Sequence, residues 1–323
     1  MPKKAPDKKK QLKDLRAKLA RLGHGTGKVS DHRSFRPDDL RRTIQKQKSP
    51  NVRPASPLET ILYQRNLPRT SRRSNIDSER ADRYRVVLED SVTEGREIET
   101  PRGKLFEICL PVSELEGADT LGERFGDQLD EPQSSLCRKL VPTLDPTALT
   151  PSDIVFMDIE STGLNNSPLF LIGVMLWQNG GFEVRQFFAR NYAEEAGVII
   201  RFIEECYPRK LLVTFNGKSY DMPFIRARAA ANGLPFDLQP PHFDLLHESR
   251  RVWKDTLPDC KLQTLERHIC KRNRHGDIPG SEIPDAYHAY VRTNDAWQMV
   301  EALKHNMLDL VTLADIMTRF PEQ

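Results

Sequence analysis

The stretch IVFMDIESTGL, residues Ile154–Leu164, decides the fold because it joins an apolar run to two acids placed one residue apart. Such a run predicts a strand, and residues i and i+2 of a strand point to the same face. Asp158 and Glu160 are therefore predicted to project side by side. Two like charges about 4 Å apart repel by about 4 kcal/mol at an effective dielectric constant of about 20, so the pair needs water or a cation. Asp-x-Glu is also a common tripeptide, so the pair alone does not establish a metal site.

The pattern that follows this stretch predicts a mixed α/β sheet. Further strands are predicted at 169–177, 181–189 and 211–216, with Asn179, Gly180 and Gly181 forming a hairpin connection. An amphipathic helix is predicted at 193–207, before the last of these strands. No G-x-G-x-x-G follows the first strand, which argues against a doubly wound nucleotide-binding fold. The remainder is predicted to be mostly helical and to end in a long helix at about 295–319.

Three more polar residues have the chemistry of a metal or proton-transfer site. Asp221 begins the helix after the 211–216 strand, where capping of the helix N-terminus is an alternative role. His305 and Asp309 are four residues apart and share a face of the last helix, where His305 could also be a residue at the core boundary. Four carboxylates can hold two divalent cations about 3.5 to 4 Å apart for phosphodiester hydrolysis. Mg²⁺ or Mn²⁺ suits such oxygen ligands, and His305 could accept the proton of the attacking water.

The carboxylates Asp158, Glu160, Asp221 and Asp309 resemble the DEDD exonuclease set of the ribonuclease H-like superfamily. More specifically, residues 151–323 resemble the YprB-like ribonuclease H-like domain family, through MDIESTGL, TFNGKSYDMPFI, HFDLLHESRRVW, CKLQTLERHI, DIPGSEIPDAYHAYV and HNMLDLVTLA. The resemblance implies a five-stranded mixed sheet flanked by helices. It also implies a metal-dependent 3′ to 5′ exonuclease that acts on ends of single-stranded DNA or RNA.

One spacing departs from the family pattern. In the histidine-type DEDD enzymes the histidine stands five residues before the last aspartate, whereas His305 stands four before Asp309. Five helical steps turn about 500° and four turn about 400°, so the imidazole would approach from a different direction. The role of His305 as general base is therefore less firmly implied than the four metal ligands.

Two loops are predicted to contact the substrate. Thr162 and Gly163 follow the first strand and could offer backbone amides to a terminal nucleotide, while Asn216 and Lys218 precede Asp221 and could contact a phosphate. Lys218 could equally be a solvated loop residue. Asp244 is predicted to lie near the acidic edge or to cap a helix.

The charge distribution divides the chain into three predicted parts. Residues 1–56 hold 17 Lys and Arg against 5 Asp and Glu, whereas the rest hold 32 against 41. We predict a basic, mostly disordered tail at 1–75 with a short amphipathic helix near 9–22, a small β element and acidic connector at 76–150, and the ribonuclease H-like domain at 151–323. A basic tail beside an acidic domain suggests nucleic acid or a ribosome as a partner, although a solubilising extension is an alternative.

Composition excludes several other classes. The five cysteines form no CxxC pair, which argues against a disulfide scaffold and favours a reducing, cytoplasmic location. The longest apolar run has nine residues, so no membrane span is predicted, and no secretory signal is expected at the N-terminus. Two alternatives to the exonuclease stay open: a non-catalytic nucleic-acid or ribosome-binding module, and a structure-specific endonuclease on the same fold.

Overall fold

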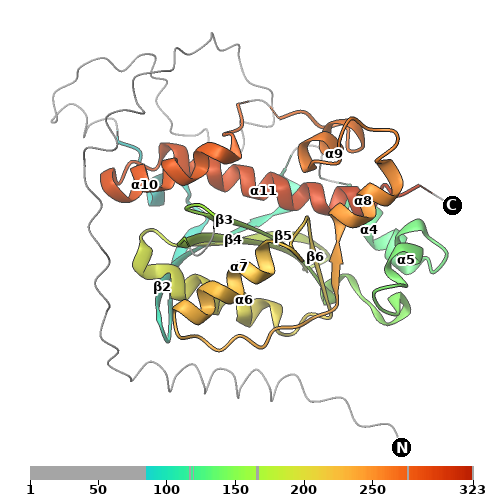
Figure 1. Ribbon diagram of the computed structural model, residues 1–323, viewed down its shortest axis with the longest axis horizontal. Coiled ribbons are helices and arrows are strands. Elements are labelled where there is room, and N and C mark those ends of the chain that lie inside the picture. Colours follow the sequence, from blue (N-terminus) through green and yellow to red (C-terminus); the bar gives the residue numbers. More distant parts are fainter. Residues whose placement is uncertain (1–84, 116–117, 119, 165–166, 275, 322–323) are drawn as a thin grey trace, which may run out of the picture.

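The computed structural model describes residues 85–115, 118, 120–164, 167–274 and 276–321 (Figure 1). The predicted tail at 1–75 and its helix near 9–22 lie outside these residues. All five cysteines lie within them, and none forms a disulfide. Within the described ranges, no helix has both the length and the apolar character needed to cross a bilayer.

The centre of the molecule is one mixed sheet of seven strands in the order β1-β2-β5-β4-β3-β6-β7. Neighbouring strands among β1, β2, β5, β4 and β3 pair antiparallel. β6 pairs parallel with β3, and β7 pairs parallel with β6. The strands are β1 Gly95–Thr100, β2 Gly103–Pro111, β3 Ile154–Ser161, β4 Leu169–Gln178, β5 Gly181–Phe188, β6 Leu211–Thr214 and β7 His242–Asp244.

Helices flank the sheet on both faces (Figure 1). α6 and α7 lie on one face, and α11 crosses the other face, where it packs against β3 and β4. α10 lies beside α11 on the same face. The helices are α3 Leu88–Ser91, α4 Leu121–Asp130, α5 Ser135–Leu140, α6 Glu195–Cys206, α7 Asp221–Ala231, α8 Leu245–Trp253, α9 Leu262–His268, α10 Ile283–Thr293 and α11 Trp297–Met317. Short 3₁₀ turns complete the description: η4 Val112–Glu114, η5 Pro146–Ala148, η6 Pro151–Asp153, η7 Tyr192–Glu194 and η8 Gly280–Glu282.

The predicted mixed sheet with flanking helices is confirmed: residues 151–323 supply the five expected strands, β3 to β7, and β1 and β2 from the predicted small β element extend the sheet to seven. β1 falls on residues 95–100, inside the predicted small β element, and pairs with β2 along its whole length. β7 is a three-residue strand that was not predicted, because it is too short to show a period.

Two regions before β3 also differ from expectation. Within the described residues, the predicted small β element begins with the helix α3, which places Leu88 and Val92 one turn apart and buries both. The predicted acidic connector between this element and β3 contains α4 and α5. α4 packs on α11 and β5, and the Phe125 ring lies 5.8 Å from the Phe156 ring of β3. Residues 95–111 therefore extend the sheet of the 151–323 region, and the domain boundary near 150 stays a prediction.

The position of α11 depends on a glycine in the central strand β4. Gly173 pairs with Asp158 of β3, and a Cβ atom at Gly173 would lie 2.0 Å from Oδ1 of Asn306 on α11. Since any side chain here would overlap Asn306, glycine permits the close approach of α11 to the sheet. This approach brings the polar face of α11 next to the acids of β3.

Candidate metal-dependent active site

Asp158 and Glu160 lie near the end of β3 and, as residues i and i+2, face the same side of the sheet. That side is the one covered by α11, because Nδ2 of Asn306 donates a 2.9 Å hydrogen bond to Oδ2 of Asp158. Asn306 is itself held by Gln186 of β5, whose Nε2 donates to its Oδ1 over 2.9 Å. The register between β3 and β4 shifts between Glu160 and Ser161, where the ladder becomes irregular.

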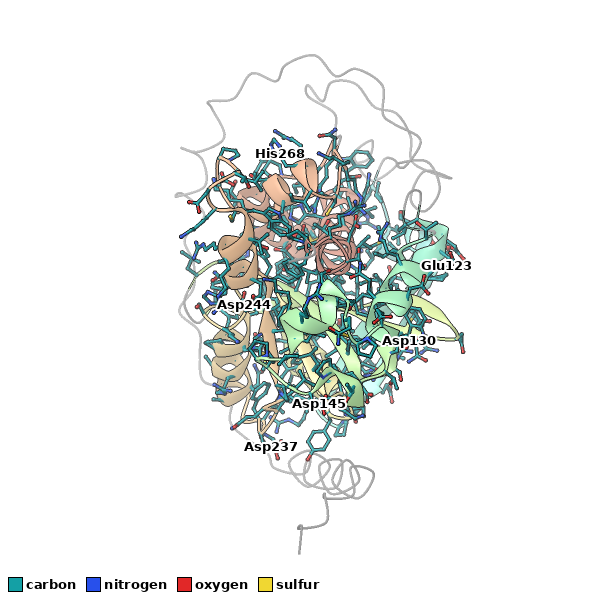
Figure 2. The ribbon with its side chains drawn as sticks, turned by 90° about the vertical axis from the view of Figure 1, so that its right-hand side faces the viewer. Glu123, Asp130, Asp145, Asp237, Asp244 and His268 are labelled. Atoms are coloured by element: carbon teal, nitrogen blue, oxygen red, sulfur yellow. The ribbon has the colours of Figure 1, made fainter. Side chains whose placement is uncertain are left out.

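Asp221 is the first residue of α7 and is buried. It follows the loop after β6, in which Gly217 is needed because a Cβ there would lie 2.8 Å from Oδ2 of Asp221. The loop is fastened by Asp244, which accepts from the backbone N–H groups of Asn216 (2.8 Å) and Lys218 (3.1 Å). Asp244 also accepts a hydrogen bond from the N–H of Leu246 and so caps α8. Capping a helix is one of the two roles predicted for Asp244. Figure 2 shows Asp244 where the chain passes from β7 into α8.

His305 and Asp309 share a face of α11, as predicted from their spacing. Nε2 of His305 lies 3.4 Å from Oδ2 of Asp309, and Nδ1 lies 2.9 Å from both carboxylate oxygens of Asp277. Arg274 contacts Asp309 and forms ion pairs with Glu266 at 2.6 Å and Asp277 at 3.2 Å. Asp309 is therefore held on one side by a histidine and on the other by a guanidinium.

Burial and neighbouring charges raise the pKa values of three of the predicted acids, Asp158, Glu160 and Asp221. Burial raises the pKa of Asp158 well above its ordinary value, and the charges of Asp309, Glu160 and Asp221 raise it further. Burial likewise raises the pKa of Glu160 to about 8, with Asp309 and Asp221 adding to the rise and His305 opposing it. For Asp221, burial raises the pKa to about 7. The acids whose charges act on Asp158 therefore come from β3, α7 and α11.

His305 and Asp277 shift each other in opposite directions. Burial opposes the charged form of His305, but the hydrogen bond to Asp277 and the charge of Asp309 outweigh it and raise the pKa of His305 to about 8. Burial would also raise the pKa of Asp277, but the hydrogen bond from His305, with the charges of His305 and Arg274, lowers it instead. Because an ionised carboxylate can only accept, Nδ1 of His305 carries the shared proton.

The donor set fits divalent cations. Burial, together with neighbouring negative charges, raises the pKa values of Asp158, Glu160 and Asp221, so an added positive charge would stabilise their ionised forms, and carboxylate oxygens are the ligands that Mg²⁺ and Mn²⁺ prefer. In the part of the chain that the structure describes, no three such side chains are arranged to hold an ion as they stand. Arg274 engages Asp309, so this contact would have to be exchanged for metal ligation by Asp309.

The predicted substrate-contacting residues lie in two loops beside the acids. The N–H of Thr162 donates to the carbonyl of Pro168 at 2.9 Å, so this amide is engaged within its own loop. Gly163 has a φ of 152° and its carbonyl accepts from the hydroxyl groups of Ser161 and Ser167. Asn216 has a positive φ of 65°, and Lys218 is exposed. The contacts of all four with substrate stay predictions.

Sequence reasoning missed the residues that support the acids: Asn306, Gln186, Asp277, Arg274 and Glu266. Asn306 follows His305 in HNMLDLVTLA, and Asp277 is the first residue of DIPGSEIPDAYHAYV, so both belong to motifs that carry the family resemblance. Arg274 and Glu266 carried no signal, because an arginine in a loop and a glutamate in a helix are ordinarily solvated. Here the side chains of Arg274 and Glu266 are only 7% and 2% exposed.

Comparison with known proteins supports the motif-based resemblance. A family model described as the RNase_H superfamily matches residues 155–320, just over half of the chain. The chain is 28% identical over 235 residues to a Bacillus subtilis (strain 168) protein named uncharacterized protein YprB, a match that spans 71% of this chain and 53% of that protein. The chain thus spans about half the length of this relative.

Among solved structures, the chain is similar to the family B DNA polymerase from the hyperthermophilic archaeon Pyrobaculum calidifontis. The TM-score is 0.41 at 16% identity, over 50% of this chain and 24% of the polymerase. A similarity of this extent is too low to carry an argument about fold or activity.

Membership in the ribonuclease H-like superfamily supports a nuclease-type function in general. Nucleases of this superfamily generally use divalent metal ions. The predicted resemblance to the YprB-like ribonuclease H-like family is confirmed. With a matched model over residues 155–320 and a mixed sheet whose acids converge from β3, α7 and α11, the chain belongs to the RNase_H superfamily.

Proposed function

We propose that this protein is a metal-dependent 3′ to 5′ exonuclease that hydrolyses phosphodiester bonds at the ends of single-stranded nucleic acid. The observation that carries the proposal is the environment of Asp158: burial raises its pKa well above its ordinary value, and the charges of Asp309, Glu160 and Asp221 raise it further. Burying like charges together costs free energy, so a cluster of this kind is characteristic of functional sites.

Asp158, Glu160, Asp221 and Asp309 are the proposed ligands of two Mg²⁺ or Mn²⁺ ions. When bound, such a pair activates the attacking water and stabilises the leaving oxygen of the phosphodiester. Asn306 keeps the carboxylate of Asp158 oriented through the 2.9 Å hydrogen bond, and Asp244 holds the loop that delivers Asp221.

His305 is the proposed proton acceptor. The hydrogen bond to Asp277 fixes the proton on Nδ1 and turns Nε2 toward Asp309, so Nε2 is the nitrogen directed at the acid cluster. An acceptor must be neutral, and the pKa of about 8 keeps His305 mostly protonated at neutral pH in the absence of other cations. Positive charge beside the acids would lower this pKa and free Nε2 to act as a base.

The substrate strand is proposed to approach over the two loops that contain Thr162, Gly163, Asn216 and Lys218. Lys218 is exposed and belongs to the loop that positions Asp221, which suits contact with a phosphate. The 17 basic residues of positions 1–56 would tether the protein to nucleic acid through sequence-independent charge attraction.

The decisive experiment incubates purified protein with end-labelled single-stranded DNA and RNA, with Mg²⁺ or Mn²⁺ and with EDTA. We expect stepwise shortening from the 3′ end that requires metal and is lost in Asp158→Ala. The matched control is Asp130→Ala, which removes an exposed carboxylate at the end of α4.

Two results would redirect the proposal. Cleavage of circular single strands would indicate an endonuclease, since an exonuclease has no end to start from. Binding without cleavage under any metal, with the binding lost on deletion of residues 1–56, would indicate a non-catalytic nucleic-acid or ribosome-binding module. Metal-independent cleavage that survives Asp158→Ala would remove the mechanism altogether.

A further inference from the structure

A cavity of about 400 Å³ lies between α7 and the segment that leads into β7. Figure 2 shows this segment on one side of the molecule, running from Asp237 near the lower end to Asp244. Its lining includes Lys218, Met222, Arg226, Leu238, Gln239 and His242. A cavity of this size is within the range that holds a small organic ligand.

The cavity carries two positive charges that no carboxylate of the described residues neutralises. Neither Lys218 nor Arg226 forms an ion pair with a described carboxylate, whereas Arg228, two residues further along α7, pairs with Glu195 at 2.6 Å. Many other described arginines are paired in the same way. Two cations left free at one concave site favour an anionic ligand, and lysine and arginine together suit a phosphate group.

The remaining lining suits the uncharged part of a nucleotide. Met222 and Leu238 are buried apolar side chains, and the guanidinium of Arg226 lies over the ring of Phe236 at 5.6 Å, which restrains it at the cavity. Burial lowers the pKa of His242 to about 4, so this ring is neutral at physiological pH. A ligand with one anionic group and one flat, weakly polar ring system matches this lining.

The cavity is connected to the acid cluster through the loop after β6. Nε2 of His242 lies 2.8 Å from Oγ1 of Thr214, and that hydroxyl accepts from the N–H of Gly217 at 3.2 Å. Gly217 in turn lies against Asp221, and Lys218 follows it. The cavity therefore adjoins the loop that delivers one of the four proposed metal ligands.

We propose that this cavity is a nucleotide subsite, in which Lys218 and Arg226 bind a phosphate and the apolar wall receives the base. The proposal extends the proposed nuclease function, since a subsite next to Asp221 would hold either a free nucleotide product or a nucleotide of the strand. Both sources present the same phosphate chemistry to the two cations.

The test measures binding by the full-length chain in EDTA, so that no metal and no cleavage are involved. The probes are adenosine monophosphate, adenosine, and a short single-stranded oligonucleotide. We expect Arg226→Ala and Lys218→Ala each to weaken binding of the monophosphate or the oligonucleotide about tenfold or more, and adenosine to bind weakly to all variants. The matched control is Arg292→Ala, which removes an exposed arginine of α10 on the opposite face of the sheet.

The outcomes separate the two sources and the two proposals. A loss confined to the monophosphate identifies a product site, and a loss confined to the oligonucleotide identifies a strand site. Equal binding by wild type, Arg226→Ala and Arg292→Ala, or no binding of either phosphate probe, overturns the subsite. Circular dichroism checks that each variant is folded, and cleavage is measured in a separate assay. Binding that depends on Arg226 in a protein without nuclease activity would support the subsite and reject the exonuclease.

Discussion

Nδ1 of His305 lies 2.9 Å from both carboxylate oxygens of Asp277, while Nε2 of the same ring lies 3.4 Å from Asp309. The ring is therefore fixed between an acid that holds its proton and an acid of the proposed metal site. Asp277 belongs to the loop before α10, and Arg274 of the same loop contacts both Asp277 and Asp309. The loop thus couples the orientation of the histidine to the position of Asp309.

Replacing Asp277 by asparagine should lower the pKa of His305, because the asparagine keeps a hydrogen-bond acceptor and loses the negative charge. We expect the pKa to fall from about 8 toward the ordinary value of 6.5. In Asp277→Asn, the acidic limb of the pH profile of the cleavage rate should move to lower pH. Asp277→Ala should instead reduce the rate about tenfold to a hundredfold, because the His305 ring is no longer held in place. NMR titration of His305 checks the shift independently of activity. An unchanged titration in Asp277→Asn would show that Asp277 does not control the histidine.

Asp158→Asn should separate stability from activity. The asparagine can still accept the hydrogen bond from Asn306, but it removes one of the mutually repelling acids. We expect the metal-free protein to gain on the order of 1 kcal/mol in free energy of unfolding, while cleavage falls by about two orders of magnitude or more. Urea unfolding in EDTA and the oligonucleotide assay measure the two effects. A variant that is destabilised and still active would argue that Asp158 has a structural role.

The stability of the metal-free protein should fall as pH rises. The folded pKa of Glu160 is raised from 4.5 to about 8, so its stabilising contribution is complete below about pH 4.5 and is lost as pH rises through 8. His305 acts in the same direction between 6.5 and about 8. We therefore expect the free energy of unfolding in EDTA to be lower at pH 8.5 than at pH 6.5, by on the order of 1 to 3 kcal/mol.

Divalent cations should oppose this loss. Mg²⁺ or Mn²⁺ that binds the ionised acids should raise the melting temperature more at pH 8.5 than at pH 6.5, since fewer protons must be displaced at the higher pH. Calcium-free buffers with and without MgCl₂ provide the comparison. A metal-induced rise of equal size at both pH values would indicate binding elsewhere on the protein.

Deletion of residues 1–56 should change affinity without changing the chemistry. These residues hold 17 basic side chains, so their removal should weaken binding to long single strands and flatten the dependence of binding on salt concentration. The maximal cleavage rate at saturating substrate should be unchanged, because the proposed ligands all lie beyond residue 157. Binding isotherms at several salt concentrations measure the slope. An unaltered slope would favour the solubilising role for this extension.

The sequence predicted the elements that carry the acids, because each depends on a strong local pattern. The apolar run before Asp158 predicted β3, and the spacing of His305 and Asp309 predicted their common face on α11. It did not predict β1 or β7, whose residues form strands through pairing with neighbours and not through their own period. Arg274 and Asp277 were missed for a related reason, since their burial depends on how an irregular loop packs on α11.

Gly173→Ala should disturb the site from inside the core. The added Cβ would lie 2.0 Å from Oδ1 of Asn306, so Asn306 or α11 must move, and the hydrogen bond to Asp158 is weakened. We expect a loss of about 1 to 3 kcal/mol in free energy of unfolding from overpacking, together with reduced cleavage. Gly126→Ala is the matched control, because the new Cβ on α4 meets nothing within 4 Å and should stabilise its helix by up to about 1 kcal/mol. Denaturant unfolding of the two variants checks both signs, and a neutral Gly173→Ala would show that α11 does not depend on this contact.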